Sequence, residues 1–191
     1  MKYADTKVVF REVPDEITLA VNISGCPVGC KGCHSPYLAG DVGEPLDAAA
    51  LDRLIASNPG ITCVSLMGGD ADPAYVGQLC RHLKEQYPGL KTCWYSGRLL
   101  DRAGDVLPWL DFIKVGPWIE EFGPLDSPTT NQRFYAIFHD PAPAQRYATT
   151  LPGGDDQPSA PAPAEALPAG AYLPAGIRLE DRTSRLRKIV F

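Results

Sequence analysis

Three cysteines lie close together near the N-terminus, Cys26, Cys30 and Cys33, in a C-x3-C-x2-C pattern. Thiolates at this spacing, on a loop rich in glycine and proline, can converge on one small object. An iron–sulfur cluster requires such convergence because cysteine thiolates hold its irons. Three ligands can hold three irons of a four-iron cube, and an open coordination position makes a metal site catalytic rather than structural. The spacing therefore predicts a [4Fe-4S] cluster with one iron left open to a substrate.

A non-catalytic zinc or electron-transfer module is the alternative for the same thiols. Structural zinc prefers four protein ligands, and no fourth cysteine lies near Cys33. His34 is the nearest other candidate, but directly adjacent residues are awkward to aim at one ion. A two-cluster ferredoxin needs more clustered cysteines than this chain has. The cluster is the favoured interpretation, and the module stays open as the alternative.

The other three cysteines, Cys63, Cys80 and Cys93, are spread along the chain and each lies in an apolar pattern. Six cysteines in a small secreted protein would suggest disulfides. This chain is longer, and residues 1–7 lack the apolar segment of a signal peptide. We therefore expect reduced thiols, with these three acting as small buried hydrophobic residues.

Composition narrows the class of protein. The 191 residues are 45% hydrophobic and 21% charged, which suits one globular domain with a real core. A net charge of −5 argues against a nucleic-acid partner, which usually meets a basic surface. The sequence shows no apolar run long enough to span a membrane. We expect a cytoplasmic enzyme that binds neither nucleic acid nor membrane.

Hydrophobic periodicity predicts alternating strands and helices. A strand over residues 16–24, in which Leu19, Val21 and Ile23 alternate with polar or small residues, delivers the chain to the cysteine loop. Further expected elements are strands over 7–13, 61–67, 91–95, 110–115 and 134–138, and helices over 48–57, 73–87 and 99–107. This order predicts an α/β fold with right-handed crossovers.

The C-terminal quarter changes composition. Residues 141–176 are rich in proline, alanine and glycine and lack periodicity, so they are expected to form a low-complexity insertion. Residues 177–181 regain apolar side chains and are expected to pair with the strand over 134–138. The predicted organisation is a domain over 1–140, the insertion over 141–176, and a returning strand with a basic tail over 177–191.

Five stretches carry a resemblance to a known family. They are VNISGC at 21–26, GCH at 32–34, SLMGGD at 65–70, KVGP at 114–117 and SPTTNQR at 127–133. Over residues 17–138 the chain resembles the radical S-adenosylmethionine enzymes, and within them is similar to the activating proteins of anaerobic ribonucleoside-triphosphate reductase. One departure is Gly32, where many members of the superfamily carry an aromatic residue.

The resemblance implies a small partial (βα) barrel with the cluster at the mouth formed by the strands' C-terminal ends, where α/β folds generally bind ligands. Cys26, Cys30 and Cys33 would ligate the [4Fe-4S] cluster, and S-adenosylmethionine would chelate its open iron. The residues implied to contact this cofactor are Gly32, Cys33, His34, Gly68, Gly69, Asp70 and Ser96. The roles of Lys114, Asn131, Gln132 and Arg133 stay open.

The resemblance also implies one-electron chemistry. A low-potential cluster would cleave S-adenosylmethionine reductively, and the resulting 5′-deoxyadenosyl radical would take a hydrogen atom from a backbone glycine. The partners would be the large subunit of anaerobic ribonucleoside-triphosphate reductase and an electron donor such as flavodoxin. The near alternative is another small radical enzyme, acting on a different glycyl-radical protein or on a small molecule.

Overall fold

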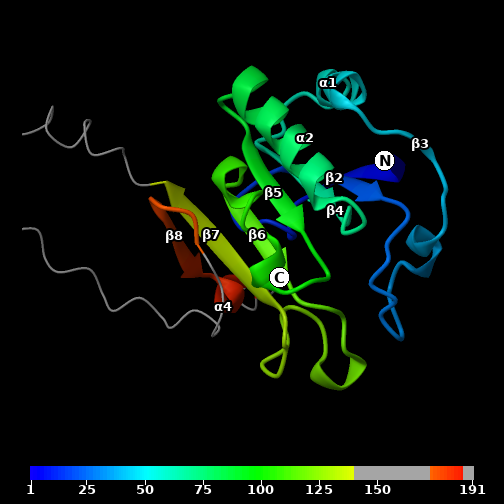
Figure 1. Cartoon of the computed structure of the whole chain (residues 1–191), viewed down its shortest axis with the longest axis vertical. Helices are drawn as coiled ribbons and strands as arrows, with labels where there is room; N and C mark the ends of the chain where they lie inside the picture. The colour runs from blue at the N-terminus through cyan, green and yellow to red at the C-terminus, as the bar shows by residue number, and fades with distance from the viewer. Residues whose placement is uncertain (140–172, 187–191) are drawn as a thin grey trace, which may run out of the picture.

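A computed structural model describes residues 1–139 and 173–186 of the chain. Within these ranges eight strands form one mixed sheet in the order β3-β1-β2-β4-β5-β6-β7-β8 (Figure 1). The strands are β1 (Lys2–Val9), β2 (Thr18–Ile23), β3 (Glu44–Pro45), β4 (Cys63–Met67), β5 (Lys91–Tyr95), β6 (Phe112–Val115), β7 (Arg133–His139) and β8 (Ile177–Asp181).

Four parallel strands form the centre of the sheet. β2, β4, β5 and β6 are neighbours in that order, with Asn22 opposite Met67 and Met67 opposite Tyr95. Antiparallel strands flank them, β1 and β3 on one side and β7 and β8 on the other. The carboxyl ends of the four central strands therefore meet at one edge, where an α/β sheet binds its ligands.

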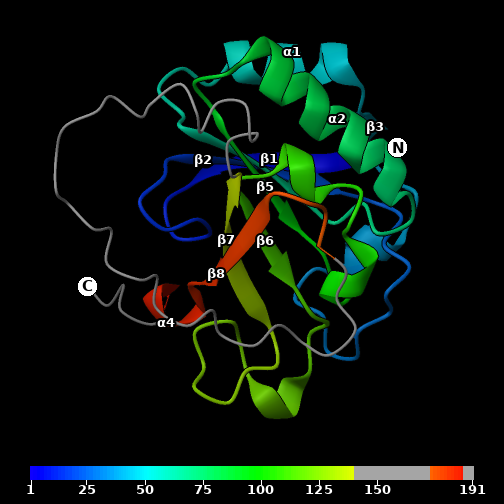
Figure 2. The ribbon, with the colours of Figure 1, turned by 60° about the vertical axis from the view of Figure 1, so that its left-hand side comes forward.

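Two helices cover one face of the sheet, α1 (Ala48–Ala56) and α2 (Pro73–Gln86) (Figure 2). Each begins at an aspartate whose carboxylate accepts a main-chain N–H of the first turn. Asp47 accepts from Ala50 at 2.8 Å, and Asp72 accepts from Tyr75 at 3.0 Å. Such caps satisfy donors that a helix start leaves unpaired, which is why these two helices begin where the sequence predicts.

The alternation of side chains along the strands gives the sheet two buried faces. Under the helices, Val21, Leu66 and Trp94 belong to the larger apolar cluster. The opposite face is covered by other parts of the chain. Its smaller cluster consists of Val13, Cys63, Cys93, Phe112, Phe134, Ala136 and Leu186. Val13 comes from the loop between β1 and β2, and Leu186 from the one-turn helix α4 (Thr183–Leu186).

The α/β class is confirmed, and so is the pairing of the returning strand, in which Ile137 lies opposite Leu179. The strand expected over 7–13 has the wrong bounds, because β1 contains residues 7–9 but begins at Lys2. β1 ends at Val9 because it pairs antiparallel with β2, Val9 opposite Thr18, and the chain then turns to bury Val13.

The helix expected over 99–107 is also wrong. Two 3-10 turns replace it, η2 (Leu100–Arg102) and η3 (Leu107–Trp109). Gly104 lies within the segment and Pro108 directly follows it, and both residues disfavour a helix interior.

The insertion over 141–176 lies almost wholly outside the described residues, as does the end of the basic tail. No helix within the described ranges combines the length and apolar character needed to cross a membrane.

Candidate functional site

A cavity of about 740 Å³ opens at the carboxyl ends of the four parallel strands. Every central strand contributes to it, β2 through Asn22 and Ile23, β4 through Met67, β5 through Tyr95 and β6 through Lys114. The loop after β2 supplies the three clustered cysteines to the same cavity. The sheet thus brings the cysteine motif and the strand ends to one place.

The cysteine loop is anchored at its first cysteine. Gly25 N–H donates to the Gly40 carbonyl at 3.0 Å, and Cys26 N–H donates to the Leu38 carbonyl at 2.9 Å. Leu38 belongs to the 3-10 turn η1 (Pro36–Ala39). These main-chain bonds hold the start of the loop against the segment that follows it, which fixes the position of Cys26.

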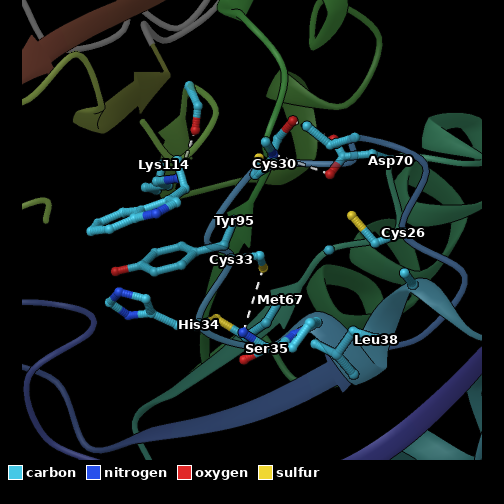
Figure 3. A pocket seen from close by; sticks show the side chains of 18 of the residues that line it. Cys26, Cys30, Cys33, His34, Ser35, Leu38, Met67, Asp70, Tyr95 and Lys114 are labelled. Atoms are coloured by element: carbon cyan, nitrogen blue, oxygen red, sulfur yellow. Dashed lines mark hydrogen bonds between the residues drawn. The ribbon is translucent and has the colours of Figure 1, made fainter. Parts of the chain in front are cut away.

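The other two cysteines are held by a local turn. Cys33 N–H donates to the Cys30 carbonyl at 3.3 Å, and Ser35 N–H donates to Cys33 Sγ at 3.4 Å. Cys26 and Cys30 are half-buried and Cys33 is exposed. Burial raises the pKa of the Cys26 thiol. Figure 3 shows the three side chains around the same hollow, with Asp70 and Lys114 beside it.

The donor set suits an iron–sulfur cluster. Cluster irons take cysteine thiolates, and all three thiols of the motif line one cavity. In the part of the chain that the structure describes, no group of three His, Cys, Asp or Glu side chains is arranged so that it could hold a single metal ion. The three remaining cysteines, Cys63, Cys80 and Cys93, are buried and line no part of this cavity.

The two glycines after β4 have different roles. Gly68 lines the cavity with φ +102°, and a Cβ there would lie 3.2 Å from the Ile23 carbonyl oxygen. Gly69 has φ +87°, and its Cβ would lie 2.6 Å from Val76 Cγ2 of α2. Both positions need glycine because of the left-handed backbone. Only Gly68 faces the cavity, whereas Gly69 lets the helix approach the strand end.

Asp70 and Ser96, both predicted to contact the cofactor, contact each other. Asp70 is only 3% exposed. Ser96 Oγ–H donates to Asp70 Oδ1 at 2.5 Å, and Gly97 N–H donates to Oδ2 at 3.1 Å. Both carboxylate oxygens therefore hold the loop after β5 in place.

That loop in turn contacts the cysteine loop. A Cβ on Gly97 would lie 2.9 Å from Val28 Cγ2, and Val28 stands between Cys26 and Cys30. Gly97 thus allows a close approach that any larger residue would prevent. The sequence pattern did not reveal this contact, although a glycine two residues after a strand end was its one visible signal.

Lys114 is a cation at the cavity wall. Its ammonium group donates to the Gly116 carbonyl at 2.8 Å. Burial lowers its pKa to about 8, and the nearby Cys30, Asp70 and Cys33 partly oppose that shift. The side chain is therefore mostly charged at neutral pH, close to two of the three thiols.

The residues whose roles the sequence left open, Asn131, Gln132 and Arg133, fold the loop before β7. Asn131 Nδ2–H donates to the Pro117 carbonyl at 3.0 Å, and Gln132 Nε2–H donates to the Gly116 carbonyl at 3.3 Å. Arg133 donates to the Thr130 carbonyl at 2.8 Å. Of the three, Gln132 lines the cavity.

The same loop region contributes an aromatic ring to the site. Trp118 lines the cavity beside Gly32 and His34. Its ring centroid lies 4.3 Å from that of His34, with the planes inclined by 54°. Sequence spacing gave no sign of this contact because 84 positions separate the two residues.

Comparison with known proteins gave one family. A family model described as a 4Fe-4S single cluster domain matches residues 17–122, which include the three clustered cysteines and the four parallel strands. Neither the curated proteins nor the solved structures contain a match to the chain.

Proposed function

The chain belongs to the 4Fe-4S single cluster domain family, and from that premise we propose that it is a radical S-adenosylmethionine activase. Its proposed reaction is formation of the glycyl radical on anaerobic ribonucleoside-triphosphate reductase. One observation carries the proposal: a single cavity joins all three cysteines of the motif to the ends of four parallel strands. An electron carrier needs no such cavity beside its cluster.

The proposed cluster ligands are Cys26, Cys30 and Cys33. With S-adenosylmethionine bound, the cluster would supply one electron for its reductive cleavage to methionine and a 5′-deoxyadenosyl radical. The chain's own part is to hold both groups, orient them and exclude water. Lys114, a cation near Cys30 and Cys33, is placed to offset the negative charge of the ligating thiolates.

The residues predicted to contact S-adenosylmethionine divide into those proposed to touch it and those proposed to hold the site in shape. Gly32, Cys33, His34 and Gly68 line the cavity and are proposed to touch S-adenosylmethionine. Asp70 and Ser96 also line it, but their mutual hydrogen bond favours a role in holding the strand ends. Gly69 is proposed to act indirectly, through the packing of α2.

The size of the cavity agrees with a cofactor of this kind. At about 740 Å³ it lies within the range of roughly 300–1,000 Å³ that is usual for small-molecule sites. The proposal includes a radical SAM partial barrel, supported by four adjacent parallel strands with the cysteine loop directly after the first of them. The large subunit of the reductase and a donor such as flavodoxin are the proposed partners.

The test is made without oxygen. The full chain is reconstituted with iron and sulfide and reduced, and its EPR spectrum is recorded with and without S-adenosylmethionine. A four-iron signal that changes on adding the cofactor supports the proposal, and formation of a glycyl radical on the added reductase completes it. A cluster spectrum indifferent to the cofactor favours electron transfer. Turnover of a small molecule without any protein partner favours the other small radical enzymes.

Ligand assignment is tested by a matched pair of variants. Cys30→Ala should abolish cluster assembly, because it removes one of three thiolates. Cys80→Ala should assemble a normal cluster, because Cys80 is buried in the apolar cluster under the helices. Iron and sulfide per chain are the measurement. Loss of the cluster in Cys80→Ala would contradict the assignment.

A further inference from the structure

The indole nitrogen of Trp118 is a buried donor without an acceptor. Its Nε1 atom is shielded from solvent and makes no hydrogen bond within the described residues. The two other tryptophans differ: Trp94 Nε1–H donates to the Gly68 carbonyl at 2.7 Å, and Trp109 packs with Arg81 over its ring. A buried polar group that lacks a partner is destabilising, so an unpaired N–H at a cavity wall needs an explanation.

The position of this N–H is defined by the cysteine loop. A Cβ built on Gly32 would lie 3.5 Å from Trp118 Nε1. Gly32 stands between the second and third cysteines of the motif, Cys30 and Cys33. Gly32 has a left-handed backbone, with φ +69°, and the indole nitrogen lies at van der Waals distance from its Cβ position. The N–H therefore stands beside the part of the loop that carries two proposed ligands.

Other contacts fix the ring. His34 packs against the indole at 4.3 Å between ring centroids. The preceding residue, Pro117, accepts a hydrogen bond from Asn131. The carboxylate of Glu120 lies at the same 3.5 Å from the Gly32 Cβ position, but Glu120 is exposed and no hydrogen bond joins it to the indole. The described residues offer this N–H no acceptor, and a group bound in the cavity can supply one.

We propose that Trp118 Nε1–H donates a hydrogen bond to a sulfur of the cluster, either a ligating thiolate or a sulfide, and so raises the reduction potential of the cluster. Sulfur carries more negative charge in the reduced cluster, so the hydrogen bond stabilises the reduced form more than the oxidised form. Reduction adds one electron, no covalent bond forms or breaks, and the proton stays on the indole. The inference rests on the proposed ligand set, but on neither S-adenosylmethionine nor the reductase.

The first experiment measures the potential of the reconstituted full chain without S-adenosylmethionine. Trp118→Phe removes the N–H and keeps an aromatic ring. At a fixed solution potential we expect the ratio of reduced to oxidised cluster to fall about tenfold, which corresponds to about 59 mV for one electron. Trp109→Phe removes an indole N–H from outside the cavity lining and should leave the potential unchanged. Equal potentials in wild type and Trp118→Phe would overturn the inference.

The second experiment looks for the hydrogen bond directly in the wild-type protein. Wild-type chain is produced with tryptophan labelled by ¹⁵N in the indole, and the reduced cluster is studied by pulsed EPR. A ¹⁵N coupling in the wild-type protein supports the hydrogen bond, and its loss in Trp118→Phe assigns it to this residue. Absence of any indole coupling in wild type overturns the inference. This measurement also decides the matter if Trp118→Phe fails to hold a cluster. Failure of wild type to assemble a cluster would instead refute the ligand assignment, and the inference with it.

Discussion

Asp70 shows how much of the site depends on one buried side chain. Its two carboxylate oxygens accept hydrogen bonds from Ser96 Oγ–H and Gly97 N–H, which lie 26 and 27 residues further along the chain. Gly97 then contacts Val28 of the cysteine loop. The carboxylate thus connects the end of β4 to the end of β5 and, through it, to the proposed ligands.

Asp70→Asn should destabilise the fold. An amide at this position presents an NH₂ group to one of two donors, so a buried donor loses its acceptor. The expected loss in free energy of unfolding is about 2 kcal/mol. Urea denaturation of the cluster-free chain measures it. Ser96→Ala, which removes one donor and leaves the carboxylate in place, should cost only about 1 kcal/mol. Equal stability of Asp70→Asn and wild type would contradict the structural role.

The six thiols should differ in their reaction with iodoacetamide at about pH 8, because only a thiolate is alkylated. Burial raises the pKa of Cys93 to about 12 and that of Cys80 further, so both stay protonated in the folded chain. Exposed Cys33 should react first. Mass spectrometry of the cluster-free protein follows each site. Modification of Cys93 before unfolding would show that the burial described here does not hold in solution.

At the scale of elements, the sequence predicted correctly those elements at which two local signals agree. Helices α1 and α2 begin at Asp47 and Asp72 because a cap and the apolar periodicity agree there. The strand expected over 7–13 ends early, at Val9, and its expected last residue is apolar for another reason: Val13 packs on the far face of the sheet. Apolar character favours burial but does not establish it, since Phe10 of the same segment is 66% exposed. Nor does it show which element buries a residue such as Val13.

The candidate site likewise combines residues that local sequence predicted with contacts that it could not predict. Spacing alone predicted Cys26, Cys30 and Cys33, because the motif lies within eight consecutive residues. The contact of Trp118 with His34 and that of Gly97 with Val28 could not be predicted. They join segments that are distant in sequence and adjacent only once β2, β5 and β6 are aligned in the sheet.

The close packing of the loop after β5 against the cysteine loop gives a prediction at the scale of elements. Gly97→Ala would place a methyl group 2.9 Å from Val28 Cγ2, so it should displace the cysteine loop and lower the amount of cluster assembled. Val28→Ala shortens the opposing side chain, and the double variant should recover most of the loss. Iron content per chain provides the readout. Additive losses in the double variant would mean that the two residues do not interact.

At the scale of the whole molecule, the end of the described chain belongs to the core. β8 pairs with β7, Thr183 Oγ1 accepts the Phe134 N–H at 2.9 Å, and Leu186 is only 8% exposed in the smaller apolar cluster. These contacts close the sheet face opposite the helices. Sequence composition suggested a solvated basic tail here and gave no reason to expect a buried leucine.

Leu186→Ala should therefore cost about 2–4 kcal/mol of unfolding free energy, as large-to-small changes in a core do. Arg185→Ala is the control from the adjacent position. Its side chain is 54% exposed and pairs with an exposed Asp15, so its loss should be within about 1 kcal/mol. Thermal unfolding of the two variants decides between a core and a surface role. Similar behaviour of both would place α4 outside the core.

The cavity is lined from Asn22 to Gln132, and this span has a consequence for biosynthesis. The cysteines leave the ribosome about 100 residues before the last lining residue, an interval of roughly 5–20 s at usual rates of translation. During that time the set of strand ends that surrounds the thiols is incomplete. A cluster can be enclosed only after β6 and the loop following it have joined the sheet, so we expect cluster delivery to follow translation of the parallel strands.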